Sequence, residues 1–249
     1  MKEKKIKHWQ IESNRFVAYI DILGFKELVL NNSFEYLINK FRILNNDNLL
    51  FSSPNLFNKE NELVCFHSIY FSDTIYIFSS NDSISSFRNF LLALYYYTNG
   101  LLFNNIPFTG AISHGSAYID IDKNLFFGKP IIDSYILGEQ VNYIGLVAHN
   151  SIDKYISSFN SSDVSDIVDN YLFQAKTPLK CGSITHNNLY WFNILDLEIR
   201  EDLSIEMETK KSIKVIEDFF LTSSGSPRRY FDNTLDLMKK VWEDKKIIK

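Results

Sequence analysis

The pattern of hydrophobic and polar positions changes character within residues 15–29, RFVAYIDILGFKELV. Apolar and β-branched side chains fill nearly every position of residues 15–22, as in a strand that is covered on both faces. Asp21 lies near the carboxyl end of this run, and Gly24 follows it. After Gly24 the apolar positions recur at helical spacing. The stretch predicts a buried strand, a glycine turn and an amphipathic helix.

A second pair of strand-like runs surrounds Ser72 and Asp73 within residues 63–80. Two short β-rich runs separated by two turn-forming residues predict a hairpin, so we expect Asp73 at or beside its turn. The apolar spacing of residues 83–103 predicts a helix that packs on the sheet. The strand expected next contains Gly110 and Gly115, which mark a bulge or a close backbone approach.

The remaining pattern alternates helices with strands. We expect a helix over 34–44, a surface loop over 45–61, a polar turn over 120–125, a helix from 127 to about 141, a strand over 144–148, a helix over 152–157, a Ser- and Asp-rich connection over 158–168, strands within 171–182 and 189–195, and helices over 205–220 and 230–246. This order predicts an α/β fold, an α+β sandwich with helices covering a mixed or antiparallel sheet. We divide it into an N-terminal arm (1–14), a catalytic core (15–160) and a C-terminal extension packed on the core (161–249).

Composition narrows the classes of function. The chain has 249 residues, of which 45% are hydrophobic, so it can bury a sizeable core. Its net charge of −4 argues against nucleic acid as a partner, because no general basic field is present. No apolar run reaches the roughly 18 residues that span a bilayer, and no apolar segment follows the basic N-terminus as in a signal peptide. Two cysteines, Cys65 and Cys181, form no disulfide framework or metal motif, so we expect a reducing cytoplasm.

Asp21 and Asp73 are the residues with the clearest chemical potential. Taken alone, each aspartate is as consistent with a structural role, as a helix cap or a turn former, as with a functional one. Two carboxylates on adjacent strands, beside a turn whose backbone amides open a helix, can instead hold divalent cations against a triphosphate. In two-metal catalysis one ion activates an attacking oxygen while the other stabilises the leaving oxygens.

The pattern resembles the class III nucleotidyl cyclases, and within them the bacterial pyrimidine cyclases of Pycsar antiphage systems. The motifs that carry the resemblance are FVAYIDILGF (16–25), IYFSDTIYIFS (69–79), GAISHGSAYI (110–119) and FFGKPIIDSYILGE (126–139). Weaker matches are IGLVAH, TPLKCG and YFDNT, and the whole resemblance covers about residues 15–240. It implies a class III cyclase-like fold with a C-terminal α/β extension.

The resemblance also implies a site. Asp21 and Asp73 match the metal-binding aspartates, and the backbone carbonyl of Ile22 completes the coordination of two Mg²⁺ or Mn²⁺ ions. The metal-activated ribose 3′-oxygen would attack the α-phosphorus, expel pyrophosphate and close a 3′,5′-cyclic monophosphate. In the family this site lies between two subunits, which implies a homodimer.

The amides of the glycine turn have a role in the same scheme. The resemblance places the backbone N–H groups of Leu23, Gly24, Phe25 and Lys26 against the β- and γ-phosphates. Such chemistry depends mostly on positioning and charge neutralisation, so no covalent nucleophile is needed.

The chain departs from the purine cyclases at four positions. Those enzymes read the base with a lysine and an acid where this chain has Ile69 and Leu125. They hold ribose and transition-state charge with an asparagine and an arginine where it has Ile132 and Ile136. The first pair of changes favours a pyrimidine base. The second pair means that another cation substitutes, or that the protein is a degenerate binder.

Candidates for the substituting cation are Lys129 first, then Lys26 and Arg42, although surface lysines are commonly only solvated. His114, in the glycine-flanked strand, is expected to be a satisfied structural histidine rather than a site residue. These residues complete the candidate set.

The leading hypothesis is a pyrimidine nucleotide cyclase, a phosphorus–oxygen lyase that acts on UTP or CTP, with UTP slightly preferred. Its product would be read by a separate effector protein in antiphage defence. One alternative is a catalytically degenerate nucleotide-binding or scaffolding relative. Another is a palm-domain nucleotidyltransferase, which the low charge disfavours.

Overall fold

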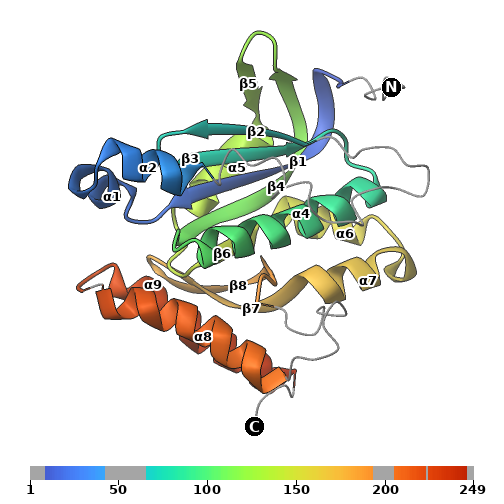
Figure 1. Cartoon of the computed structure of the whole chain (residues 1–249). Helices are drawn as coiled ribbons and strands as arrows, with labels where there is room; N and C mark the ends of the chain where they lie inside the picture. Colours follow the sequence, from blue (N-terminus) through green and yellow to red (C-terminus); the bar gives the residue numbers. More distant parts are fainter. Residues whose placement is uncertain (1–8, 43–65, 193–204, 223, 246–249) are drawn as a thin grey trace, which may run out of the picture.

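The structure, a computed structural model, describes residues 9–42, 66–192, 205–222 and 224–245 (Figure 1). Its strands are β1 (Glu12–Ile22), β2 (Phe66–Phe71), β3 (Thr74–Ser79), β4 (Phe108–Asp120), β5 (Leu125–Gly128), β6 (Gly145–Ala148), β7 (Leu172–Leu179) and β8 (Gly182–Leu189). Its helices are α1 (Phe25–Asn31), α2 (Phe34–Phe41), α4 (Ile84–Phe103), α5 (Lys129–Gly138), α6 (Asn150–Ser157), α7 (Ser161–Tyr171), α8 (Ile205–Thr222) and α9 (Arg228–Asp244).

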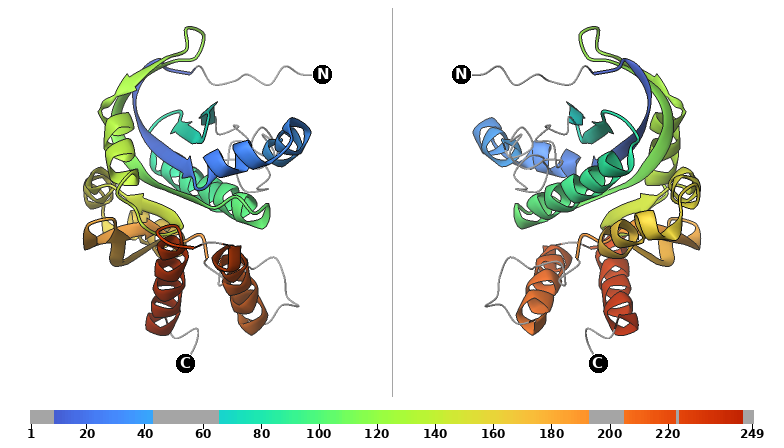
Figure 2. Two further views of the ribbon diagram at one scale, coloured as in Figure 1. Left: turned by 90° about the vertical axis from the view of Figure 1, so that its left-hand side faces the viewer. Right: turned by 90° about the vertical axis from the view of Figure 1, so that its right-hand side faces the viewer.

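The described strands form one eight-stranded sheet in the order β2-β3-β1-β4-β6-β8-β7, with β5 paired to β4. Every pairing is antiparallel except that of β4 with β6. Helices cover the sheet, with α4 on one face and α5 on the other (Figure 2). The predicted α/β fold with a mixed, mostly antiparallel sheet is therefore confirmed.

Strand β1 lies near the centre of the sheet because both of its faces are apolar. Phe16 and Ile20 point into the main core, which also contains the buried side chains of α4. Val17 points to the opposite face, where it packs in a smaller cluster with Phe78 and Ile131 of α5. This double burial explains why nearly every position of the strand is hydrophobic.

Two glycines let α5 and β4 approach β1 closely. A Cβ atom on Gly110 would lie 2.0 Å from the carbonyl oxygen of Tyr19. A Cβ atom on Gly138 would lie 2.5 Å from the Tyr19 ring. The close approach predicted at Gly110 is confirmed, and the carboxyl end of α5 is fixed beside Tyr19.

Three local predictions were wrong. Residues 125–128 form a strand, β5, which pairs with β4 and moves the start of the following helix to Lys129. The Ser- and Asp-rich connection contains α7, because Val164, Ile167 and Tyr171 bury one face of it at helical spacing. Strand β8 lies at Gly182–Leu189, upstream of the expected 189–195, and residues 193–195 lie outside the described residues.

The sheet runs through both predicted parts of the chain, because β7 and β8 continue the order set by β1, β4 and β6. The domain boundary at residue 160 stays a prediction. The N-terminal part of the arm, the loop over 45–61 and Cys65 lie outside the described residues. Within the described part of the chain, no helix has both the length and the apolar character needed to cross a membrane.

Candidate functional site

The carboxyl end of β1 brings Asp21 and Asp73 together. Asp21 is aligned with Thr74, the first residue of β3, so Asp73 directly precedes its neighbour in the sheet. The Ile22 amide donates a hydrogen bond to the Asp73 carbonyl oxygen over 2.9 Å. Ser72 makes the hairpin turn with a positive φ of 58°. The two predicted aspartates therefore lie side by side, one at the end of β1 and the other in the adjoining β2–β3 turn.

Negative charge outweighs positive charge around this pair of aspartates. Burial, together with the negative charges of Asp73 and Glu139, raises the pKa of Asp21 to about 7, although the positive charge of Lys180 opposes the shift. Neighbouring negative charge disfavours ionisation of the Asp21 carboxyl, and a bound cation would reverse that effect. The cluster is thus a place where positive charge is stabilised.

The glycine turn presents fewer amides than predicted. The Leu23 amide donates to the Pro107 carbonyl oxygen over 2.9 Å, so it is not available to a phosphate in this conformation. Gly24 adopts a left-handed conformation, φ 74°, and precedes α1 without a side-chain cap. The first amides of a helix have no intrahelical acceptor, so Gly24, Phe25 and Lys26 remain the candidate phosphate donors.

Lys129 is not brought to the aspartates within one chain. It follows Gly128, which pairs with Ala117 on β4, whereas Asp21 pairs with Thr109. Eight residues of strand separate those two partners, about 26 Å. The Lys129 ammonium instead donates to Asp133 Oδ1 over 2.7 Å. The other cation candidates lie on α1 and after α2, where Lys26 and Arg42 are exposed.

Glu139 and Lys180 are site neighbours that sequence reasoning missed. The Tyr19 hydroxyl donates to Glu139 Oε1 over 2.8 Å, which holds the carboxylate at the end of α5 beside the β1 terminus. The Lys180 amide donates to the Gln140 carbonyl oxygen over 2.7 Å, which fixes the β7–β8 turn there as well. The weak match of TPLKCG was the only signal that pointed to Lys180.

An aromatic cavity of about 370 Å³ lies on the same face of the sheet as Asp21. It is lined by Tyr19, Ile69, Phe71, Thr74, Tyr76, Phe78, Phe126, Ile131 and Tyr135. The rings of Tyr76 and Phe126 each lie within 7° of parallel to Phe78, so they form a stacked floor. No lining residue carries a formal charge, and the polar groups are hydroxyls. The cavity therefore suits a flat, uncharged ring system.

The α5 face beside this cavity exposes apolar side chains. Ile132 is 58% exposed and Ile136 is 52% exposed. Neither can hold ribose or charge. Exposed apolar side chains that gather in this way mark a surface that can be covered by another molecule.

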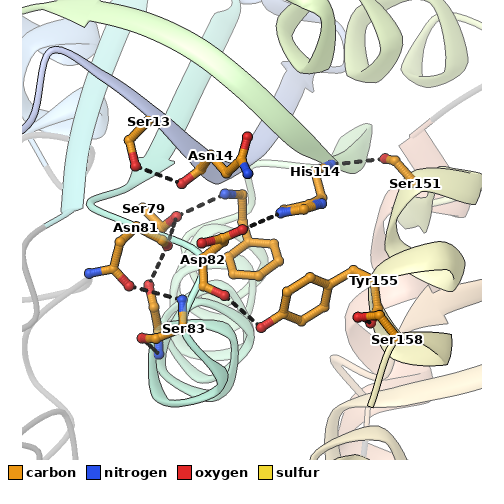
Figure 3. A network of polar contacts seen from close by, with 12 residues as sticks. Ser13, Asn14, Ser79, Asn81, Asp82, Ser83, His114, Ser151, Tyr155 and Ser158 are labelled. Atoms are coloured by element: carbon orange, nitrogen blue, oxygen red, sulfur yellow. Dashed lines mark hydrogen bonds and ion pairs between the residues drawn. The ribbon is translucent and has the colours of Figure 1, made fainter.

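His114 belongs to a separate polar network (Figure 3). Its Nε2 lies 3.0 Å from Asp82 Oδ2, and its backbone amide donates to Ser151 Oγ over 2.9 Å. The Tyr155 hydroxyl donates to the Asp82 carbonyl oxygen. His114 pairs with Phe16, five residues along the strands from the Asp21–Thr109 pair. These contacts confirm the prediction of a satisfied structural histidine.

The described part of the chain brings fewer than three His, Cys, Asp or Glu side chains together at any one place. Within the described ranges, no group of three or more His, Cys, Asp or Glu side chains is placed to hold a metal ion. Asp21 and Asp73 thus supply two carboxylates, and further ligands would have to come from backbone, water or substrate.

No protein-family model and no curated protein matches the chain. Among solved structures, one that is similar is a bacterial light-regulated adenylyl cyclase, with 11% identity and a TM-score of 0.44. The similarity covers 72% of this chain and 91% of the other. At that identity and TM-score it assigns neither a family nor an activity, so a function has to be inferred from the site.

Proposed function

We propose that the protein is a nucleotidyl cyclase that converts a pyrimidine nucleoside triphosphate, UTP or CTP, to its 3′,5′-cyclic monophosphate and pyrophosphate. The observation that carries the proposal is the pairing of Asp21 with Asp73 beside the Gly24 turn, where burial and like charge raise the pKa of Asp21 to about 7. A carboxylate pair with excess negative charge is suited to bind divalent cations.

The two carboxylates and the backbone carbonyl oxygen at this site are suitable ligands for Mg²⁺ or Mn²⁺. Oxygen ligands are what both ions prefer, and Mg²⁺ is commonly bound by one or two carboxylates with the remaining ligands from water and phosphate. When bound, two such ions would supply activation of the ribose 3′-oxygen and charge neutralisation at the leaving pyrophosphate. We assign Asp21, Asp73 and the Ile22 carbonyl to them.

The chain's own residues would orient the triphosphate. The amides of Gly24, Phe25 and Lys26 open α1 and lack helical acceptors, which suits phosphate oxygens. Lys180 lies close enough to lower the pKa of Asp21 against the other acids, so its charge would also attract a phosphate bound beside that carboxyl. No covalent nucleophile is required for in-line transfer.

The base would occupy the aromatic cavity. Ile69 lines it where purine cyclases carry a lysine, and its stacked rings offer a face to a pyrimidine. Stacking on aromatic side chains contributes about 1–3 kcal/mol per base without reading its edge. Hydroxyls of Thr74 and the tyrosines would then supply the polar contacts.

The complete site would lie between two copies of the chain. In the resembled family both subunits contribute, and Ile132 and Ile136 expose an apolar surface that a second copy would cover. Lys129, remote from Asp21 within one chain, would enter the site only from the partner. In Pycsar-like signalling, a separate effector would read the cyclic product during antiphage defence.

The test is product formation by purified protein. Each of the four ribonucleoside triphosphates is incubated with Mg²⁺ or Mn²⁺, and cyclic product and pyrophosphate are quantified by mass spectrometry and a phosphate assay. Asp21→Asn and Asp73→Asn should abolish both products, whereas Asp169→Asn, at an exposed position on α7, should not. Unchanged turnover in both site variants would contradict the assignment.

A degenerate nucleotide binder is the second candidate. The observation that favours it is the exposed Ile132 and Ile136 at the two positions where the resembled family holds ribose and transition-state charge. Tight triphosphate binding without turnover, measured by calorimetry beside the product assay, would support this alternative.

A further inference from the structure

The aromatic cavity runs along the strands, away from the acids. Asp21 pairs with Thr74, and the next residue of β3 on the same face, Tyr76, pairs with Tyr19. Phe78 follows on that face, two residues further along β3. Because Thr74, Tyr76 and Phe78 all line the cavity, it extends for about 13 Å along this strand. The cavity therefore has one end beside Asp21 and a deep end at Phe78.

The deep end stops at a row of three aromatic rings. On β2, Phe71 and Ile69 line the cavity, and the next residue on the same face is His67, which pairs with Phe78. The centroid of the His67 ring lies 6.5 Å from that of Phe78 and 5.9 Å from that of Phe126. All three ring planes lie within 19° of one another. We call the row of His67, Phe78 and Phe126 the end wall.

Trp9 packs against the end wall from the N-terminal segment. Its ring meets the His67 ring edge-on, with 6.0 Å between the centroids. Its Nε1 donates a hydrogen bond to the Ile119 carbonyl oxygen over 2.9 Å, and the Ile119 amide donates to the Ile11 carbonyl oxygen over 2.7 Å. Trp9 therefore connects β2 to β4 across the end of the sheet where β1 begins beside the β4–β5 hairpin (Figure 1).

Arg15 holds Trp9 in place. Its guanidinium carbon lies 4.6 Å from the centroid of the Trp9 ring, and the arginine side chain is fully buried. Its nitrogens donate to the carbonyl oxygens of Gln10 over 2.5 Å and of Ser79 over 3.1 Å. In the described part of the chain Arg15 forms no ion pair with an acid, so the ring and these oxygens are its partners. Arg15 lies six residues before Asp21 on β1, so Trp9 is fixed on the side of the end wall away from the acids.

A fixed end wall limits the size of the base. In the proposed function the triphosphate lies at the Asp21 end, so the base extends from there toward Phe78. A purine is longer than a pyrimidine by a fused five-membered ring. Closely packed side chains accept extra volume only at a cost in free energy. A purine would therefore have to displace the end wall or withdraw its phosphates from the acids.

We infer that His67, supported by Trp9, determines base specificity: it closes the deep end of the cavity behind a single six-membered ring and thereby excludes purines. The inference rests on the proposed function and adds residues that select the substrate class. Ile69 removes a polar contact to a purine, but the loss of a contact does not by itself reject a larger base. The end wall supplies a repulsive element against the wrong base, which specificity commonly requires.

The experiment compares His67→Ala and Trp9→Ala with the wild type. His67 is half-buried on the edge strand β2, and Trp9 precedes the first strand, so neither truncation should unfold the sheet. His186→Ala is the matched control, because it removes a half-buried imidazole from β8, which does not line the cavity. Thermal unfolding verifies that each variant is folded.

The probes are the 3′-deoxy analogues of UTP, CTP and ATP with Mn²⁺. They lack the hydroxyl that would attack the α-phosphorus, so calorimetry measures their affinity without turnover. The quantity compared between proteins is the affinity for the better pyrimidine analogue divided by the affinity for 3′-deoxy-ATP. This ratio separates base size from effects on the phosphates, because all three analogues carry the same triphosphate.

We expect the wild type to prefer the pyrimidine analogue by about tenfold to a hundredfold, a usual penalty for overfilling a packed site. His67→Ala should lower this preference to about threefold or less by raising the affinity for 3′-deoxy-ATP. Trp9→Ala should change the ratio in the same direction, and His186→Ala should match the wild type. Equal affinity of the wild type for both base classes, or an unchanged ratio in both His67→Ala and Trp9→Ala, would overturn the inference.

Failure of the proposed function would give a different result. A wild type that forms no cyclic product but keeps a pyrimidine preference that His67→Ala abolishes would contradict the cyclase assignment alone. Turnover of UTP or CTP with the same base preference in wild type, His67→Ala and Trp9→Ala would contradict the role of the end wall alone. A wild type that binds none of the three analogues would contradict both.

Discussion

The amide of Ile22 donates a hydrogen bond to the carbonyl oxygen of Asp73 over 2.9 Å, which joins the end of β1 to the β2–β3 turn. This backbone contact fixes the residue after Asp21 to the second aspartate itself. The separation of the two acids is therefore set by main-chain geometry rather than by flexible side chains. A rigid pair of carboxylates is what a preorganised cation site needs.

The raised pKa of Asp21 predicts a dependence of stability on pH. An acid whose pKa is about 7 in the folded state and 3.8 in the unfolded chain takes up a proton on folding between those values. The folded state binds more protons there, so stability falls as pH rises from about 4 to about 7 and then stays level.

Asp21→Asn removes the free-energy cost of keeping a buried, ionised carboxylate in the folded state. In metal-free buffer at pH 8 the variant should be more stable than the wild type by about 1–2 kcal/mol, after allowing for solvent screening of a partly exposed group. The difference should shrink as the pH falls toward 4. Urea unfolding at several pH values checks this, with Asp169→Asn as the control. An equal stability of wild type and Asp21→Asn at pH 8 would show that the carboxyl is not strained by its neighbours.

The aromatic cavity predicts separate contributions of base and phosphate to binding. Phe71 lines the cavity yet is 81% exposed, so Phe71→Ala removes a stacking surface with little loss of packing. We expect the affinity for the pyrimidine triphosphate to fall about fivefold to a hundredfold, because one base contact is lost. The affinity for inorganic tripolyphosphate should stay the same.

Phe34→Ala is the matched control, since Phe34 is 78% exposed on α2 and does not line the cavity. Calorimetry with both ligands measures the effect. A parallel loss for the nucleotide and for tripolyphosphate would mean that Phe71 acts through the fold rather than through the base.

The exposed face of α5 predicts an oligomer. Ile136→Asp places a charge on the surface that a second copy would cover, so the variant should be monomeric and inactive where the wild type is a dimer. Ile184→Asp, at a 57% exposed position on β8, is the matched control. Light scattering after gel filtration gives the mass. A wild-type monomer with full turnover would exclude a shared site.

Much of the fold was predictable because local pattern and burial agree. Strand β1 is apolar on both faces, and the turn residues Ser72 and Asp73 mark the hairpin. Strand β5 was missed because it pairs only with the neighbouring β4 and its burial pattern is weak. Helix α7 was missed because its polar composition conceals three buried positions.

Site residues could be predicted only where the local sequence pattern around them indicates the structure. Asp21 lies at the end of the predicted first strand and Asp73 in the turn of the predicted hairpin, so local pattern could locate each acid, while their juxtaposition depends on the pairing of β1 with β3. Glu139 and Lys180 reach the same end of the sheet through separate connections, and no local pattern encodes that convergence. The distance of Lys129 from Asp21 within one chain could not be predicted for the same reason, since it depends on the register of β4 with β5.

The most direct test of the central claim is mass spectrometry of the products that wild-type protein forms from the four ribonucleoside triphosphates with Mn²⁺. The account predicts that UTP or CTP yields one 3′,5′-cyclic monophosphate, with one pyrophosphate released for each molecule of product. It also predicts that ATP and GTP yield little. The absence of cyclic product from all four triphosphates, with either Mn²⁺ or Mg²⁺, would contradict it.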